Sequence, residues 1–250
     1  MTCRDMDDVI SSLLNNAEDG LRPSESLLRR IKTGIVEDLK PIRPLAPFRI
    51  LFIGCAIIFL SVVAVGALLL GMNGWGALSL VQRIVVFLTL AASAILLAIS
   101  MIRQMVPGSR HILAPAVLLV SILVLLITVI AATFRSQPES AFLVNGVMCL
   151  KNGLTYSMPA GFLLWVILRR GAILYPQLIG AVAGGFAGLA GLSVLEVNCP
   201  NLNVFHILVW HAGVVIIGSL GGTLLGAAVE SIERRRKRKG ATGSFASVPR

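Results

Sequence analysis

The stretch ILFIGCAIIFLSVVAVGALLLG, residues 50–71, decides the fold class. It contains no Asp, Glu, Lys or Arg, and it exceeds the about 20 residues that an α-helix needs to cross the hydrocarbon core of a bilayer. The whole chain of 250 residues is 56% hydrophobic and 14% charged, with a mean hydropathy of +0.87. Soluble domains are usually about a quarter charged. This composition therefore predicts a multi-span membrane protein and excludes a disordered chain and an ordinary soluble enzyme.

Five further segments lack charged side chains in the same way. They are residues 84–102, 112–134, 152–168, 171–195 and 204–229. The fourth segment is short and contains Pro159, so it is either a kinked span or a helix inserted part of the way. We count it as a span because Arg169 and Arg170 end it sharply. The prediction is an all-α membrane protein with six transmembrane helices, which occupy residues 49–229, and a short helical cytoplasmic N-terminal region.

The distribution of basic residues predicts the orientation, because short cytoplasmic loops are rich in Lys and Arg. Residues 1–49 carry 8 Lys and Arg, and the tail 230–250 carries 7, most of them in the run RRRKRK at 234–239. The loops 72–80 and 196–203 carry none. An even number of spans then places both termini in the cytoplasm of a bacterial cell whose inner membrane holds the protein. We expect the tail to contact anionic membrane lipid and not nucleic acid.

Residues 1–48 are the region that we expect to bind a cytoplasmic partner. Apolar residues recur there at helical spacing in two short stretches, before the prolines at 41, 44 and 47 form an extended linker. Two helices of this size cannot build a stable core alone, so their apolar faces must be covered by a partner, by the membrane surface or by each other. The residues predicted to bind the partner are Ile10, Leu13, Leu14, Leu27, Leu28, Ile31 and Ile35.

Sites for chemistry are scarce. The six charge-free segments offer no acid or base for proton-coupled transport or hydrolysis, and the chain has no HExxH motif or glycine-rich nucleotide loop. We therefore expect no enzyme and no organic cofactor. Two other classes of protein stay open: a small multipass transporter or channel, and a membrane thiol oxidoreductase, although the latter would usually show a closer cysteine pair.

Glycines four residues apart at 180–188 and 218–226 predict tight packing of the fifth segment on the sixth.

Two cysteines and two histidines form the strongest candidate site. The predicted topology puts Cys149 in the third outer loop and Cys199 in the fifth, where they can form a disulfide or share a metal as thiolates. Only packing of the fourth segment against the last two can bring them together. His206 and His211 are candidate ligands for a transition-metal ion such as zinc, copper or cadmium. However, five residues correspond to about 140° around an α-helix, so both would meet one ion only if the helix were distorted. The alternative is four unrelated buried side chains.

Several of these pieces together resemble the NrsF-type family of multipass anti-sigma factors. They are DLKPIRPL at 38–45, Cys149, RRGA at 169–172, the glycine-rich fifth segment, CP at 199–200, His206 and WH at 210–211. The resemblance implies that residues 1–48 sequester an extracytoplasmic-function (ECF) sigma factor. It also implies that Cys149 and Cys199 sense oxidants or heavy metals on the periplasmic side.

Overall fold

A computed structural model describes residues 25, 26, 29, 32, 33, 46–106, 114–138, 141–171 and 173–244. The chain divides into two units, Met1–Pro44 and Leu45–Arg250. In the first unit, the described residues between Glu25 and Thr33 are helical, polar and exposed, and the helical N-terminal region as a whole stays a prediction. All the residues predicted to bind a partner lie outside the described residues, namely Ile10, Leu13, Leu14, Leu27, Leu28, Ile31 and Ile35.

The regular secondary structure in the described residues of the second unit is all helical, apart from one isolated bridge between Arg135 and Asn203. Its elements are α3 (Phe48–Leu70), α4 (Asn73–Ala77), α5 (Leu80–Gln104), α6 (Pro115–Thr133), α7 (Phe142–Leu168), α8 (Pro176–Asn198), α9 (Val204–His206), η1 (Ile207–His211) and α10 (Ala212–Ser244). The all-α prediction is confirmed for this part of the chain.

Local sequence accounts for several helix boundaries. Pro115 and Pro176 occupy the first positions of α6 and α8, where a missing N–H costs no hydrogen bond. Ser79 and Gln82 form a reciprocal capping box at the start of α5. Gly71 ends α3 with a φ of 88°, which a residue with a side chain rarely adopts.

Five helical stretches are long and apolar enough to cross a membrane: α3, α5, α6, α8 and the continuous stretch Val204–Arg235. Many of their large apolar side chains are exposed, such as Leu68, Leu88 and Leu224, as lipid-facing residues would be. The helix α7 has 27 residues but does not belong to this set. The count of six spans therefore stays a prediction.

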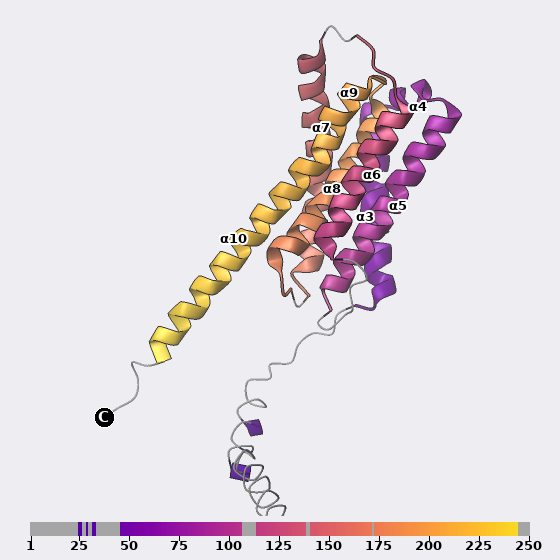
Figure 1. The fold of residues 1–250 in the computed structure, drawn as a ribbon. Helices are drawn as coiled ribbons and strands as arrows, with labels where there is room; N and C mark the ends of the chain where they lie inside the picture. Colours follow the sequence, from indigo (N-terminus) through magenta and orange to yellow (C-terminus); the bar gives the residue numbers. More distant parts are fainter. Residues whose placement is uncertain are drawn as a thin grey trace, which may run out of the picture. The chain divides into compact units, whose positions relative to one another are not determined.

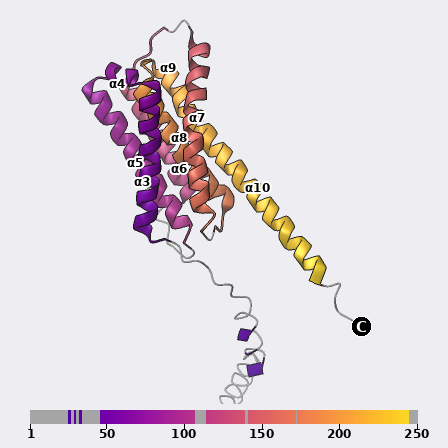
Figure 2. The same ribbon diagram turned by 180° about the vertical axis from the view of Figure 1, so that it is seen from behind.

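The helix α8 forms the core of the bundle, and α3, α5, α7 and α10 pack around it (Figures 1 and 2). The most extensive contact of α8 is with α10. A Cβ atom on Gly184 would overlap the carbonyl oxygen of Gly218, and one on Gly222 would overlap that of Gly180. The two backbones approach this closely only because glycine lacks a side chain, as the spacing predicted.

Several helices extend beyond the charge-free segments, and at α7 and α8 this corrects the sequence interpretation. The helix α7 begins at Phe142, so it includes Lys151 and places Cys149 within a helix and not in a loop. The helix α8 continues through Glu196, which is buried. The expectation of no acid or base within the spans is therefore wrong. An exposed lysine can stay in a helix, and Glu196 has a buried partner, described below.

Candidate metal and thiol site

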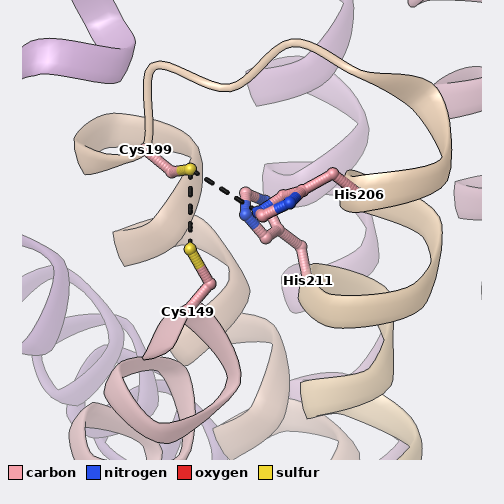
Figure 3. A group of neighbouring side chains, drawn as sticks. All are labelled: Cys149, Cys199, His206 and His211. Carbon is pink, nitrogen blue, oxygen red and sulfur yellow. Dashed lines mark hydrogen bonds between the residues drawn. The ribbon is translucent and has the colours of Figure 1, made fainter. Parts of the chain in front are cut away.

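Four side chains from three parts of the chain meet at one end of the bundle (Figure 3). Cys149 comes from α7, Cys199 from the loop after α8, His206 from α9 and His211 from η1. The sulfur atoms of the two cysteines lie 3.6 Å apart, and His206 Nε2 lies 3.8 Å from the sulfur of Cys199. One ligand atom from each residue falls within 4.8 Å of all the others. The expected proximity of the cysteines is confirmed, and both histidines join them.

The π-helical turn η1 explains how both histidines reach the same place. In η1 the backbone N–H of Ala212 bonds to the carbonyl of Ile207, five residues earlier, and not to the residue four earlier as in an α-helix. Residues five positions apart then lie about one turn apart. The rings of His206 and His211 have centroids 5.4 Å apart. The structure thus contains the distortion that their spacing requires.

Two glycines let the helix that carries Cys149 approach its neighbours. Gly146 lies about one turn before Cys149, and a Cβ atom there would overlap the indole ring of Trp210. Gly153 lies about one turn after it, and its carbonyl oxygen occupies the place that a Cβ atom on Gly191 would take. Close contacts with both η1 and α8 therefore hold this stretch of α7, and they fix where Cys149 stands.

The chain next to Cys199 is held by the C-terminal end of α3 and by α4. The Asn198 side chain donates a hydrogen bond of 2.5 Å to the carbonyl oxygen of Leu70, at the end of α3. Gly74 in α4 packs against the carbonyls of Glu196 and Cys199, so closely that a Cβ atom would lie 2.6 Å from the Cys199 oxygen. The last turn of α8 is thereby fixed next to the site.

The other end of the loop is fixed by a segment that precedes α7. Asn203 caps α9 by accepting a hydrogen bond from the N–H of Phe205. Its side-chain amide also donates a hydrogen bond of 2.6 Å to the carbonyl of Gln137. The N–H of Val204 donates to the carbonyl of Arg135. The loop between Cys199 and His206 is therefore anchored on both sides.

Glu196 is a functional candidate that the sequence interpretation missed. Its Oε1 atom lies 2.9 Å from Nδ1 of His211, and the two side chains are 3% and 1% exposed. The other ring nitrogen of His211, Nε2, is buried and has no partner in hydrogen-bonding geometry within the described part of the chain, although the ring acts on the nearby thiol of Cys199. An acidic residue three positions before Cys199, directly after a charge-free segment, was a signal that could have pointed to this pair.

The environment of Cys199 favours its thiolate form. The hydrogen bond from Cys149 lowers the pKa of Cys199 below that of an ordinary thiol, although burial opposes this effect, and His206 and His211 lower it further. Two thiolates and two imidazoles are a ligand set for zinc and for softer ions. The same two thiols, which are not joined in a disulfide, are also placed for oxidation. Cys55 is buried within α3 and does not belong to the cluster.

One of the comparisons with known proteins found a match. No curated protein and no solved structure matches this chain. The family model "NrsF: Negative regulator of sigma F" matches residues 35–229, which span most of the chain and contain the whole Cys and His cluster. The expected family is thereby confirmed: this chain belongs to the NrsF family of negative regulators of sigma F.

Proposed function

We propose that this protein is a membrane-bound anti-sigma factor that sequesters an ECF sigma factor through residues 1–48. It releases the sigma factor when Cys149 and Cys199 are oxidised or bind a heavy-metal ion. The observation that carries this proposal is the family match over residues 35–229, because that family consists of negative regulators of a sigma factor. The reactive cluster lies within the matched residues.

The partner-binding role of the N-terminal region is supported by its amphipathic pattern. The family match begins at residue 35, so most of this region lies outside it. The described residues between Glu25 and Thr33 are polar and exposed, and helical spacing places Ser26, Arg29 and Thr33 on the face opposite Leu28 and Ile31. A sigma factor that covers the apolar face would supply the core that the region cannot build by itself.

The signalling role is supported by the distance between the two sulfur atoms. Disulfide formation would shorten it from 3.6 Å to about 2.05 Å. In that reaction two thiols lose two protons and two electrons to an oxidant, and one S–S bond forms. A thiophilic metal ion is the other signal that the pair can accept, because thiolates are soft ligands.

The route from this site to the cytoplasmic side runs through α8 and α10. Cys199 follows the end of α8, and His206 and His211 precede α10. These helices are in backbone contact through Gly184 and Gly222, so a shift at the cluster moves them together. To change the ratio of sigma-releasing to sigma-retaining molecules from 1:99 to 99:1, the signal must favour the releasing state by about 5.5 kcal/mol. We place the protein in the bacterial inner membrane, with both termini in the cytoplasm.

The proposal is tested by co-purification and by a transcription reporter. The full chain, solubilised from membranes, should retain an ECF sigma factor, and Cd²⁺ or a thiol oxidant should release it. A reporter that depends on that sigma factor should rise under the same treatment. Retention of no sigma factor would contradict the proposal. Solute flux in proteoliposomes would instead identify a transporter or channel, and turnover of a dithiol substrate would identify an oxidoreductase.

A further inference from the structure

We propose that Cys149, Cys199, His206 and His211 form a four-coordinate site for a divalent d¹⁰ metal ion, such as Zn²⁺ or Cd²⁺. We further propose that Glu196 is a positioning residue that makes Nε2 of His211 a ligand. The inference rests on the proposed function only in treating this cluster as the sensor. Metal binding is measured without any sigma factor, so failure of either proposal can be recognised separately.

The distances within the cluster match a tetrahedral site. With metal–sulfur bonds of about 2.3 Å, two thiolates on a tetrahedral ion lie about 3.8 Å apart. The sulfur atoms of Cys149 and Cys199 are 3.6 Å apart. With a metal–nitrogen bond of about 2.0–2.1 Å, a sulfur and a nitrogen ligand lie about 3.6 Å apart. The corresponding distance from Cys199 to His206 Nε2 is 3.8 Å. The reduced cluster is thus close to the spacing of a tetrahedral site.

The contact between Glu196 and His211 supplies the orientation of the fourth ligand. Because the carboxylate accepts a hydrogen bond from Nδ1, the proton of the neutral ring is held on that nitrogen. The lone pair of the neutral ring is then on Nε2, the buried nitrogen without a hydrogen bond in the described residues. Histidines that bind metals commonly donate their other N–H to a carboxylate in this way. A bound ion would be coordinated by this lone pair.

The charge of the site favours a divalent ion. Two thiolates and the Glu196 carboxylate together carry three negative charges, in a region where Glu196 and His211 are almost fully buried. A divalent ion leaves one net negative charge and a monovalent ion leaves two, and uncompensated buried charge is costly. The C-terminal end of α8, which Cys199 caps, also favours a cation. Cys149 is only partly buried and offers the ion a route into the site.

The test uses the purified full-length protein in detergent, reduced and without added metal. Zn²⁺ affinity is measured by competition with a chromophoric chelator, and Co²⁺ serves as a spectroscopic substitute. We expect one ion per chain, a thiolate-to-cobalt charge-transfer band, and ligand-field bands with the intensity of a tetrahedral complex. The Cys199→Ser variant should lose this binding.

The role of Glu196 is tested by Glu196→Gln, with Glu233→Gln as the matched control on the exposed part of α10. Glu196→Gln should weaken Zn²⁺ binding about 10- to 100-fold, as substitutions of such supporting residues usually do. It should also alter the ligand-field bands while retaining the charge-transfer band, because both cysteines remain. Glu233→Gln should change neither quantity.

A second background separates positioning from general structural damage. The His211→Cys variant supplies a thiolate that needs no carboxylate to orient it. In that background, Glu196→Gln should change Zn²⁺ affinity less than threefold. The positioning role is overturned if Glu196→Gln leaves the cobalt spectrum and affinity unchanged, or if it weakens binding equally in the His211→Cys background. The metal site itself is overturned if the parent protein binds no ion, or if Cys199→Ser binds one equally well.

Discussion

Glu196 and His211 form a buried pair, with Oε1 of the carboxylate 2.9 Å from Nδ1 of the imidazole, although 15 residues separate them in the sequence. An acidic residue inside a membrane-spanning helix is costly unless it is paired, and such residues usually mark a functional site. This pair joins the last turn of α8, directly before Cys199, to η1, which carries His211.

The pair should behave as one unit in stability measurements. Replacing only Glu196 or only His211 by Leu leaves the other polar group buried without its partner, so each single variant should lose about 3–5 kcal/mol of unfolding free energy. The double variant should lose clearly less than the sum of the two. Denaturant unfolding in mixed micelles measures all three. Additive losses would show that the two side chains do not depend on each other.

The two thiols should likewise act as one sensor. Cys149→Ser, Cys199→Ser and the double variant should all insert in the membrane and retain the sigma factor, and all should lose its release by oxidant or Cd²⁺. The physical reason is that one thiol can neither form the internal disulfide nor complete the ligand set. Cys55→Ala removes a buried thiol away from the cluster and serves as the control that should respond normally. A full response in both single variants would disprove the paired mechanism.

The N-terminal region should lose its partner when its apolar face is charged. Leu28→Asp and Ile31→Asp should each reduce sigma-factor retention at least tenfold, because each would bury an unpaired carboxylate in the interface. Thr33→Asp adds the same charge on a residue that is exposed and helical, and should leave retention within about threefold. Co-purification from detergent-solubilised membranes provides the measurement. Equal effects of all three would point to net charge and not to the apolar face.

The helical architecture and the close helix pair could be predicted from the sequence, since both depend on patterns within single segments. Charge-free runs identify the apolar helices, and glycines four residues apart on two of them predict their backbone contact. The proximity of Cys149 and Cys199 needed a topology as well. The one inferred from the basic residues placed both cysteines in outer loops, whereas Cys149 lies within α7. Helix ends were less well predicted, because a charge-free run ends at the first charged residue, whereas α7 tolerates the exposed Lys151.

Two features of the site depend on tertiary contacts or irregular geometry that the spacing of residues in the sequence does not establish. The π-helical turn at Ile207–His211 is a departure from regular helix geometry, so a spacing argument based on 3.6 residues per turn separated the histidines. Glu196 looked like the first residue of an outer loop, and only its contact with His211 shows that it belongs to the buried site. Sequence reasoning therefore identified the four side chains of the cluster but not the residue that contacts His211 from α8.

The contact between α8 and α10 allows a test with adjacent residues. Gly222→Ala places a methyl group on the carbonyl oxygen of Gly180, whereas Gly221→Ala points a methyl group into open space. The first should cost about 1–3 kcal/mol of unfolding free energy through overpacking. The second should be neutral or slightly stabilising, because alanine favours helix over glycine by up to about 1 kcal/mol. Thermal unfolding of both variants compares them directly, and equal melting temperatures would contradict the close contact.

The π-helical turn should be removable without loss of the metal site. A π turn accommodates one additional residue within a helix, so deletion of Val209, which is exposed, should restore α-helical geometry and leave both flanks in place. The two histidines would then be four residues apart, about 40° around an α-helix, and would still share one face. We expect Zn²⁺ affinity within about tenfold of the parent protein.

The control is deletion of Ile216, an exposed residue in the regular part of α10, where the helix contains no additional residue that could compensate for the deletion. It should rotate one part of the helix by about 100° relative to the other and break the glycine contacts with α8. Metal binding that survives the Ile216 deletion but not the Val209 deletion would show that the π turn does more than accommodate the histidine spacing.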